Sequence, residues 1–350
     1  MKPIIGITIG DYNGIGPEVI MKTLDDPRML DFCTPVIFGS TRLMSYHKKV
    51  LENEGFNYTR CRSLQEAREK QINVFNCWEE ELNIKIGEGT TDSGRYALIA
   101  LTQAADALAS GHIHALVTAP IGKAAVRQND PSFLGQTEFF MQKAGASEAL
   151  MMLTHEDLHV ALVTGHKALR DVPAAITSGL ILSKLQLLHN SLRKDFLISH
   201  PRIAVLSLNP HVGEQGAMGD EETTHIIPAI EEARNKSILA FGPFAADGFF
   251  GVQGYKEYDG VLAMYHDQGL APFKALAFNE GVNFTAGLPF VRTSPDHGTG
   301  FGIAGKNMAS PDSTRQAIFA AVRIVSNRAT FGEMHANPLK RSEARVEGEG

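Results

Sequence analysis

The chain alternates short apolar runs with longer segments of helical periodicity, and this alternation limits its fold more than any other feature. Strands are predicted at residues 4–10, 35–39, 115–120, 160–165 and 203–209, and a further apolar run at 261–264. Residues 94–111 carry apolar side chains at helical spacing and end at a glycine. Strands that alternate with helices usually pair in parallel. The sequence therefore predicts an α/β fold with a largely parallel sheet and flanking helices.

Length and composition favour a two-lobed globular enzyme. A chain of 350 residues is long for one core and comfortable for two. Its 43% hydrophobic and 21% charged residues are ordinary for a soluble enzyme and argue against disorder. No apolar run approaches membrane length. With 33 basic and 39 acidic residues and no basic block, nucleic acid is not expected as a partner.

Three further features concern the cellular location of the protein and the two ends of the chain. Cys33, Cys61 and Cys77 are odd in number and lack metal or redox spacing, which indicates reduced thiols and a cytoplasmic location. The opening segment, residues 1–11, is interrupted by glycines and does not make a secretory signal. Residues 336–350 are polar, charged and glycine-ended, so we expect a mobile tail there.

Three histidines follow three predicted strands. His166 comes after the strand at 160–165, His211 after that at 203–209, and His266 after that at 261–264. A single loop histidine is more often a surface or hydrogen-bonded residue, but this arrangement occurs three times. Open α/β sheets bind ligands at the carboxyl ends of their strands. Three neutral imidazoles can hold a zinc-type ion with one position open, so the pattern predicts a metal site.

Carboxylates lie near each of these histidines. Asp171 follows His166, Glu214 follows His211, and Asp267 follows His266. Such groups can orient a ligating ring or complete an octahedral ion. They can equally be solvated loop acids, and the sequence leaves both interpretations open.

The glycine-rich segment GDYNGIGPEVI, residues 10–20, follows the first strand and precedes a helical pattern. Its glycines do not fit the dinucleotide-binding GxGxxG spacing. Pro17 and Glu18 suit the first turn of a helix. We interpret the segment as a strand-to-helix turn near the active cleft.

Several of these segments together resemble one enzyme family. TGHKALRDV, LNPHVGE and YDGVLAMYHDQG are similar to motifs of the 4-hydroxythreonine-4-phosphate dehydrogenase (PdxA) family, as are GITIGDYNGIGPEV, LVTAPIGKAA, LGQTEFF and TSPDHGTGFGIAG. The likeness spans nearly the whole chain in order. It implies the two-lobed fold of isocitrate and isopropylmalate dehydrogenases, with a cofactor-side domain of residues 1–128 and 271–335. Residues 129–270 would form the metal, substrate and dimerisation domain.

The resemblance also implies cofactors and partners. It implies NAD as the oxidant, and a divalent metal, Zn, Mg or Co, held by His166, His211 and His266 from both subunits of a homodimer. Residues 296–311 resemble the cofactor loop of β-decarboxylating dehydrogenases, where glycines allow close backbone approach. Neither a membrane nor nucleic acid is an expected partner.

Substrate-binding positions carry over from the same resemblance. They are Gln136, Thr137, Lys274, Asn283 and Arg292. Lysine and arginine supply positive charge for phosphate or carboxylate oxygens, and the others add neutral hydrogen bonds. The family usually has histidine where this chain has Gln136, which can still donate a hydrogen bond to an anion but cannot become charged.

The implied reaction is oxidation of 4-phosphooxy-L-threonine, a phosphorylated hydroxy amino acid, followed by loss of carbon dioxide to give 3-amino-2-oxopropyl phosphate. The proton acceptor stays open among Asp247, Asp267 and a metal-bound water. Gln136 gives weight to a related substrate, 4-phospho-threonate. Three histidines with an open position would also suit a metal-dependent hydrolase, and the wider fold hosts phosphate acyltransferases.

Overall fold

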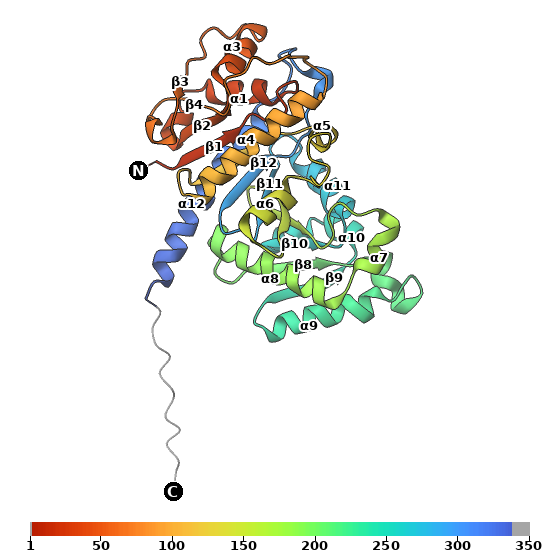
Figure 1. Ribbon diagram of the computed structural model, residues 1–350. Helices are drawn as coiled ribbons and strands as arrows, with labels where there is room; N and C mark the ends of the chain where they lie inside the picture. Colours follow the sequence, from red (N-terminus) through yellow and green to blue (C-terminus); the bar gives the residue numbers. More distant parts are fainter. Residues whose placement is uncertain (1, 338–350) are drawn as a thin grey trace.

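One mixed sheet forms the centre of the protein, whose computed structural model describes residues 2–337 (Figure 1). Within this part the sheet has 12 strands in the order β3-β4-β2-β1-β5-β12-β11-β6-β7-β10-β8-β9. The strands are β1 Ile4–Thr8, β2 Thr34–Gly39, β3 Thr59–Cys61, β4 Asn73–Asn76, β5 Ala115–Thr118, β6 Leu150–His155, β7 Leu158–Leu162, β8 Arg202–Leu206, β9 Leu239–Phe244, β10 Gly260–Ala263, β11 Val282–Ala286 and β12 Val291–Pro295.

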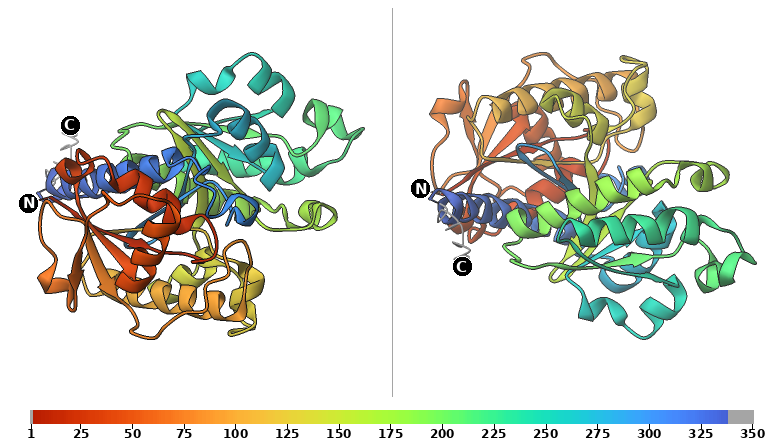
Figure 2. Two further views of the ribbon diagram at one scale, coloured as in Figure 1. Left: turned by 90° about the horizontal axis from the view of Figure 1, so that it is seen from above. Right: turned by 90° about the horizontal axis from the view of Figure 1, so that it is seen from below.

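Helices cover both faces of the sheet and give the molecule two lobes (Figure 2). They are α1 Gly16–Leu24, α2 Met29–Phe32, α3 Thr41–Val50, α4 Thr91–Ala109, α5 Lys123–Arg127, α6 Gln136–Ala144, α7 Val172–Ala175, α8 Ser178–Asp195, α9 Ile227–Asn235, α10 Ala246–Gly251, α11 His266–Ala277 and α12 Asp312–His335. The long helix α12 packs against β5, β11 and β12 and also against α1 and α8. It therefore joins the two lobes.

The strands predicted from the apolar runs are all present. β1, β2 and β5 pair in parallel, as do β7, β10 and β8. The helix predicted at 94–111 is α4, which begins three residues earlier at a capping box between Thr90 and Ser93. Gly111, with φ of 73°, lies just beyond its end. α1 begins at Gly16 and has Pro17 in its first turn, as predicted.

Antiparallel pairing in the middle of the sheet was not predicted. β11 runs antiparallel to both β12 and β6, and β6 runs antiparallel to β7. Two hairpins produce this reversal: Glu156, with φ of 49°, turns β6 into β7, and Gly287, with φ of 87°, turns β11 toward β12. The sheet is continuous between the lobes because β11 and β6 bridge them.

The second lobe contains β7, β10, β8 and β9, and other elements cover both faces of its sheet. Successive side chains of a strand point to opposite faces, so both sets are buried. Leu262 of β10 lies in the core shared with α8. Val261 and Ala263 pack on the other side with Leu270 of α11. This double burial explains why the strand at 261–264 is apolar throughout.

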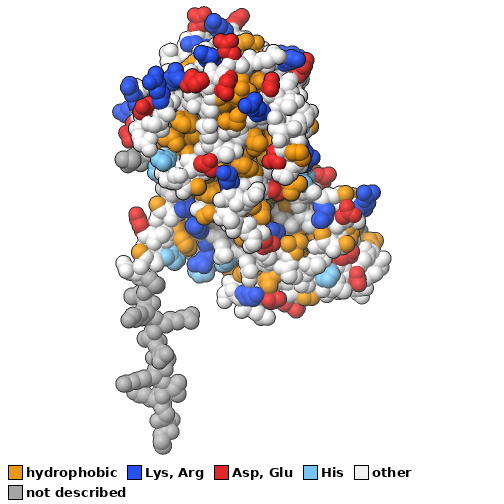
Figure 3. All heavy atoms as spheres, viewed as in Figure 1, with side chains coloured by type: hydrophobic (Ala, Val, Ile, Leu, Met, Phe, Trp, Pro, Cys, Tyr) orange, Lys and Arg blue, Asp and Glu red, His pale blue; other side chains and the backbone are white. Residues whose placement is uncertain are grey.

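Among residues 2–337, no helix combines the length and apolar character needed to cross a bilayer. Acidic and basic side chains are interspersed over the face seen in Figure 3, and no broad surface of one sign forms there. Almost all of the tail predicted at 336–350 lies outside the described residues.

Two buried histidines make the stability depend on pH. Burial lowers the pKa of His47 and of His159 to about 4, from an ordinary value of 6.5. Between these values the unfolded chain binds protons that the folded chain does not, so stability is lost as the pH falls from 6.5 toward 4. We expect the free energy of unfolding to fall by about 2 kcal/mol per histidine between pH 7 and pH 5.

Urea denaturation at several pH values checks this expectation. His159→Phe should make the decrease in stability shallower, because phenylalanine takes up no proton. The matched change at an exposed histidine, His200→Phe, should leave the slope as in the wild type. An unchanged slope in His159→Phe would contradict the assignment.

Candidate active site

A cavity of about 330 Å³ opens where several strands end between the lobes. Thr118 and Pro295, at the carboxyl ends of β5 and β12, line it, as do His166 and His266, which follow β7 and β10. β7 and β10 run antiparallel to β5 and β12, because β6 is antiparallel to both β7 and β11 and β11 is antiparallel to β12. The lining residues are Thr118, Pro120, Ile121, Lys123, Gly135, Gln136, Thr137, Glu138, Met151, His166, His266, Leu270, Lys274, Asn283, Arg292, Ser294, Pro295, Asp296, His297 and Gly298. Each lobe thus places residues from the carboxyl ends of its own parallel strands at the cavity, and such ends are where open α/β sheets bind ligands.

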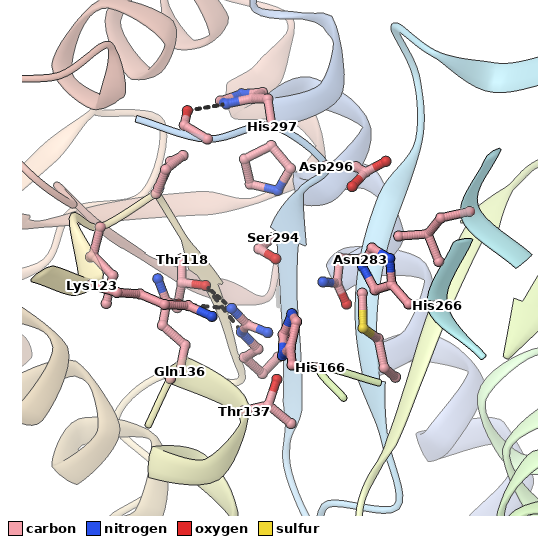
Figure 4. Close-up of a pocket in the computed structure, with 18 of the residues that line it drawn as sticks. Thr118, Lys123, Gln136, Thr137, His166, His266, Asn283, Ser294, Asp296 and His297 are labelled. Atoms are coloured by element: carbon pink, nitrogen blue, oxygen red, sulfur yellow. Dashed lines mark hydrogen bonds between the residues drawn. The ribbon is translucent and has the colours of Figure 1, made fainter. Parts of the chain in front are cut away.

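All five predicted substrate-binding residues line this one cavity, although they come from distant segments. Gln136 and Thr137 begin α6, Lys274 lies on α11, Asn283 on β11 and Arg292 on β12. In Figure 4, Thr118, Lys123 and Gln136 lie on one side of the cavity and Asp296 and His266 on the other. The sequence motifs thus converge on a single space.

Arg292 is a buried cation without a carboxylate partner among the described residues. Its side chain is only 3% exposed. Its Nε and one terminal nitrogen donate to Thr118 Oγ1 at 3.0 and 2.6 Å, and the other terminal nitrogen donates to Thr285 Oγ1 at 3.0 Å. Burial lowers the pKa of Arg292 to about 10. At neutral pH the guanidinium therefore keeps its charge beside a cavity that can admit an anion.

The first turn of α6 faces the same cation. Gly135 directly precedes this helix and also lines the cavity. Gln136 accepts a hydrogen bond from Arg292 at 2.7 Å. The positive end of the helix and the guanidinium together favour a negatively charged ligand.

Lys274 is the one predicted cation with an acidic partner. Its Nζ lies 3.3 Å from Asp296 Oδ1. Burial raises the pKa of Asp296, while Lys274 acts in the opposite direction. Lys123, which the sequence did not single out, also lines the cavity. Two lysines and Arg292 against Asp296 and Glu138 leave an excess of positive charge around the space.

His166 and His266 meet at this cavity. Their ring centroids are 5.8 Å apart. Burial lowers the pKa of His166, and Lys123 lowers it further, so the ring favours the neutral form that can bind a metal. The Nδ1 of His266 lies 2.7 Å from Asp267 Oδ1. A ligating histidine is commonly oriented by such a carboxylate.

His211 lies in a different cavity of the same chain. That space, of about 550 Å³, is lined also by Asp247, Tyr265 and Asp267. Five successive residues from His211 to Gln215 have φ between 43° and 73°, in the left-handed region of backbone conformation that residues other than glycine rarely adopt. Among residues 2–337, no three histidine, cysteine or acidic side chains gather closely enough to hold a metal ion. One chain thus brings together two of the three predicted ligands.

Of the three neighbouring carboxylates, only Asp267 contacts its histidine. Asp171 pairs with Arg170 at 3.9 Å and is exposed, as is Glu214. The acid that supports the His211 segment is instead Glu222, which is buried and accepts hydrogen bonds from the backbone of Asn209 at 2.7 Å and of Leu208 at 2.8 Å. The sequence offered no signal for it, because a lone glutamate in a polar segment is usually solvated.

The two glycine-rich segments pack on each other beside the cavity. The backbone N–H of Ile15 donates to Thr299 O at 2.9 Å. A Cβ at Gly14 would lie 2.5 Å from the same oxygen, so only glycine allows this approach. Asp11, fully buried, accepts a hydrogen bond from Ser93 Oγ at 2.9 Å, and burial raises its pKa. The turn predicted at residues 10–20 therefore supports the loop at 296–311.

Comparison with known proteins fits this geometry. A sequence model of the family described as "Pyridoxal phosphate biosynthetic protein PdxA" matches residues 31–321. The 4-hydroxythreonine-4-phosphate dehydrogenase of Bacteroides thetaiotaomicron is 48% identical over 338 residues, which cover 96% of this chain and 93% of that protein.

Solved structures agree in fold. The crystal structure of a 4-hydroxythreonine-4-phosphate dehydrogenase from Burkholderia phymatum superposes with a TM-score of 0.78 at 34% identity, covering 93% of this chain and 98% of that one. The enzyme of the same name from Klebsiella pneumoniae gives 0.79 at 32% identity, covering 93% and 100%. The predicted α/β fold is confirmed, and the chain belongs to the PdxA family of pyridoxal phosphate biosynthetic proteins.

Proposed function

We propose that the protein is an NAD- and divalent-metal-dependent dehydrogenase of pyridoxal 5'-phosphate biosynthesis. It would oxidise 4-phosphooxy-L-threonine to 2-amino-3-oxo-4-phosphobutanoate, which loses carbon dioxide to give 3-amino-2-oxopropyl phosphate. The observation that carries the proposal is a single cavity that combines the uncompensated Arg292 with the paired rings of His166 and His266. The names of the relatives support the same reaction.

Substrate binding follows from the charges around the cavity. Arg292 and the start of α6 would form one anion-binding region. Lys274, which also pairs with Asp296, would form another with Asn283 on the side of α11. A substrate with a phosphate at one end and a carboxylate at the other needs two such regions. Thr137 and Asn283 can add neutral hydrogen bonds that fix its orientation.

The donor set fits a divalent metal. His166 favours its neutral form, and Asp267 can hold His266 in one tautomer. A metal bound there would act as a Lewis acid on the substrate hydroxyl and so favour hydride transfer to the nicotinamide. Histidine ligands alone do not distinguish Zn from Co, and Mg stays a further possibility.

His211 would complete the site from the second subunit of a homodimer. It faces a cavity separate from that of His166 and His266, although Tyr265 and Asp267 lie near both histidine environments. A site shared between subunits would reconcile this separation with three ligands. Asp247 lines the cavity of His211, so it would also reach a shared site, and it remains a candidate proton acceptor. Asp267 is better suited to orient His266.

NAD would bind on the side of the first lobe, within residues 1–128 and 271–335. The supporting feature is the loop at 296–311, whose residues Asp296, His297 and Gly298 line the active cavity. Its tight packing on the turn at residues 10–20 gives it a fixed position. A cytoplasmic location agrees with a substrate of this class and with the free cysteines.

A second candidate substrate is 4-phospho-threonate, which lacks the amino group. Gln136 favours this substrate, because the family usually has a histidine at this position and glutamine, unlike histidine, cannot become charged. The wild-type enzyme should form NADH from 4-phosphooxy-L-threonine with a kcat/KM at least tenfold above that for 4-phospho-threonate, and only with metal present. The measurement is absorbance at the NADH band for both substrates under the same conditions.

The reverse ratio would assign the protein to the sugar-acid branch. No NADH from either substrate, together with no saturable NAD binding, would reject the dehydrogenase proposal. A metal-dependent hydrolase or a phosphate acyltransferase would then be the reading to test, since neither reaction needs NAD.

A further inference from the structure

Among residues 2–337, every hydrogen-bond acceptor of the Arg292 guanidinium is a neutral oxygen. The acceptors are the hydroxyls of Thr118 and Thr285 and the amide oxygen of Gln136. Glu138 is close enough to raise the pKa of Arg292 but makes no hydrogen bond to it. The surroundings therefore orient the cation and leave most of its charge for a ligand.

Gln136 can adopt only one orientation of its amide here. An arginine side chain donates and never accepts, so the group that faces it must be Oε1. The Nε2 then points the other way and donates to Ala119 O at 3.1 Å. Ala119 follows β5, so Gln136 connects the end of that strand to the guanidinium of β12.

We propose that Gln136 is a positioning residue for Arg292 and a determinant of anion affinity, and that it does not bind the substrate directly. This inference rests on the proposed function, because it assigns a role within the same cavity. Together with the hydroxyls of Thr118 and Thr285, the amide oxygen holds the guanidinium in one orientation while adding no charge. The ligand it serves is an oxyanion, the phosphate or carboxylate group of the substrate.

The chemistry of the side chain explains why glutamine suits this task. An amide oxygen accepts a hydrogen bond at every pH, whereas an imidazole nitrogen accepts only when the ring is neutral. A carboxylate would accept equally well but would pair with the guanidinium and compete with an incoming anion. Gln136 therefore keeps Arg292 both oriented and charged.

A double-mutant cycle separates positioning from direct contact. The probe is inorganic phosphate, titrated calorimetrically into the full-length metal-loaded protein without NAD. Q136M, which removes the hydrogen bonds at similar size, should weaken phosphate binding about 10-fold, and R292M about 100-fold. The double variant should bind no more weakly than R292M, because Gln136 acts only through Arg292.

Two further variants make the result specific. Q136E should weaken phosphate binding more than Q136M does, because it neutralises the guanidinium. Gln142→Met, an exposed glutamine on the same helix, should bind phosphate like the wild type. With substrate, Q136M should raise KM while kcat stays within about threefold, because the reacting atoms are untouched.

Additive effects of Q136M and R292M would overturn the inference in favour of direct contact. So would unchanged binding in Q136M, or phosphate binding in Q136E equal to that of the wild type. Thermal unfolding of each variant identifies any loss caused by misfolding, and Q136E, which keeps the shape of the side chain, tests the inference if Q136M does not fold. If the wild type turns over neither candidate substrate, the proposed function fails, while the phosphate cycle still decides the role of Gln136.

Discussion

Replacing His266 by alanine is expected to lower kcat about a thousandfold or more. The ring of His266 lies beside that of His166 and is oriented by Asp267. Removing it would take away one ligand and leave the proposed metal held by two. The measurements are the metal content of the purified protein and the rate of NADH formation with metal in excess.

The change should leave the fold intact, because His266 is half-buried at the start of α11 and its side chain is not part of a hydrophobic core. Alanine at the exposed His200 is the matched control and should retain both metal and activity. A His266→Ala protein with normal metal content and full turnover would exclude His266 from the site. Removal of metal from the wild type by a chelator should reproduce the loss, and added metal should reverse it.

Combining two inactive variants in one dimer is expected to restore activity to about half of the wild-type level. In a heterodimer of His166→Ala and His211→Ala, one site would receive both damaged residues and the other would be complete. This follows if His166 and His266 belong to one chain, as their 5.8 Å centroid separation indicates, and His211 comes from the partner. Two different affinity tags allow the heterodimer to be purified and assayed.

A second heterodimer provides the control. His166→Ala combined with His266→Ala should stay inactive, because each chain would damage its own site. Restoration in this pair but not in the first would mean that His266 is the residue contributed by the partner. If neither heterodimer regains activity, each subunit holds a complete set of ligands and the shared site is wrong.

Much of the site could be predicted because its residues follow strands with strong local patterns. The apolar runs before His166, His211 and His266 are short, buried and recognisable without tertiary information. Their order along the chain, with the surrounding motifs, was specific enough to indicate the family that the comparisons then showed. Asn283 and Arg292 were found only through the family motifs, because β11 and β12 had not been predicted as strands.

The structure also shows contacts that the sequence did not suggest. The expected contact of Gln136 with the substrate stays a prediction, while within the protein its oxygen accepts from Arg292 and its nitrogen donates to Ala119 O. Such partners cannot be read from spacing, because Gln136 and Arg292 are separated by most of the second lobe. Glu222 and Lys123 were missed for the same reason.

The amino-acid sequence by itself determined the alternation of strands and helices, the turns that only glycine allows, and the histidines at strand ends. These features depend on side-chain periodicity and backbone freedom within a few residues. The tertiary structure alone decided that β11 is reversed, that Arg292 is buried among neutral oxygens, and that His211 faces a cavity apart from His166 and His266. These outcomes depend on which distant segments pack together, and the free energy of that packing is shared among many residues and belongs to no single motif.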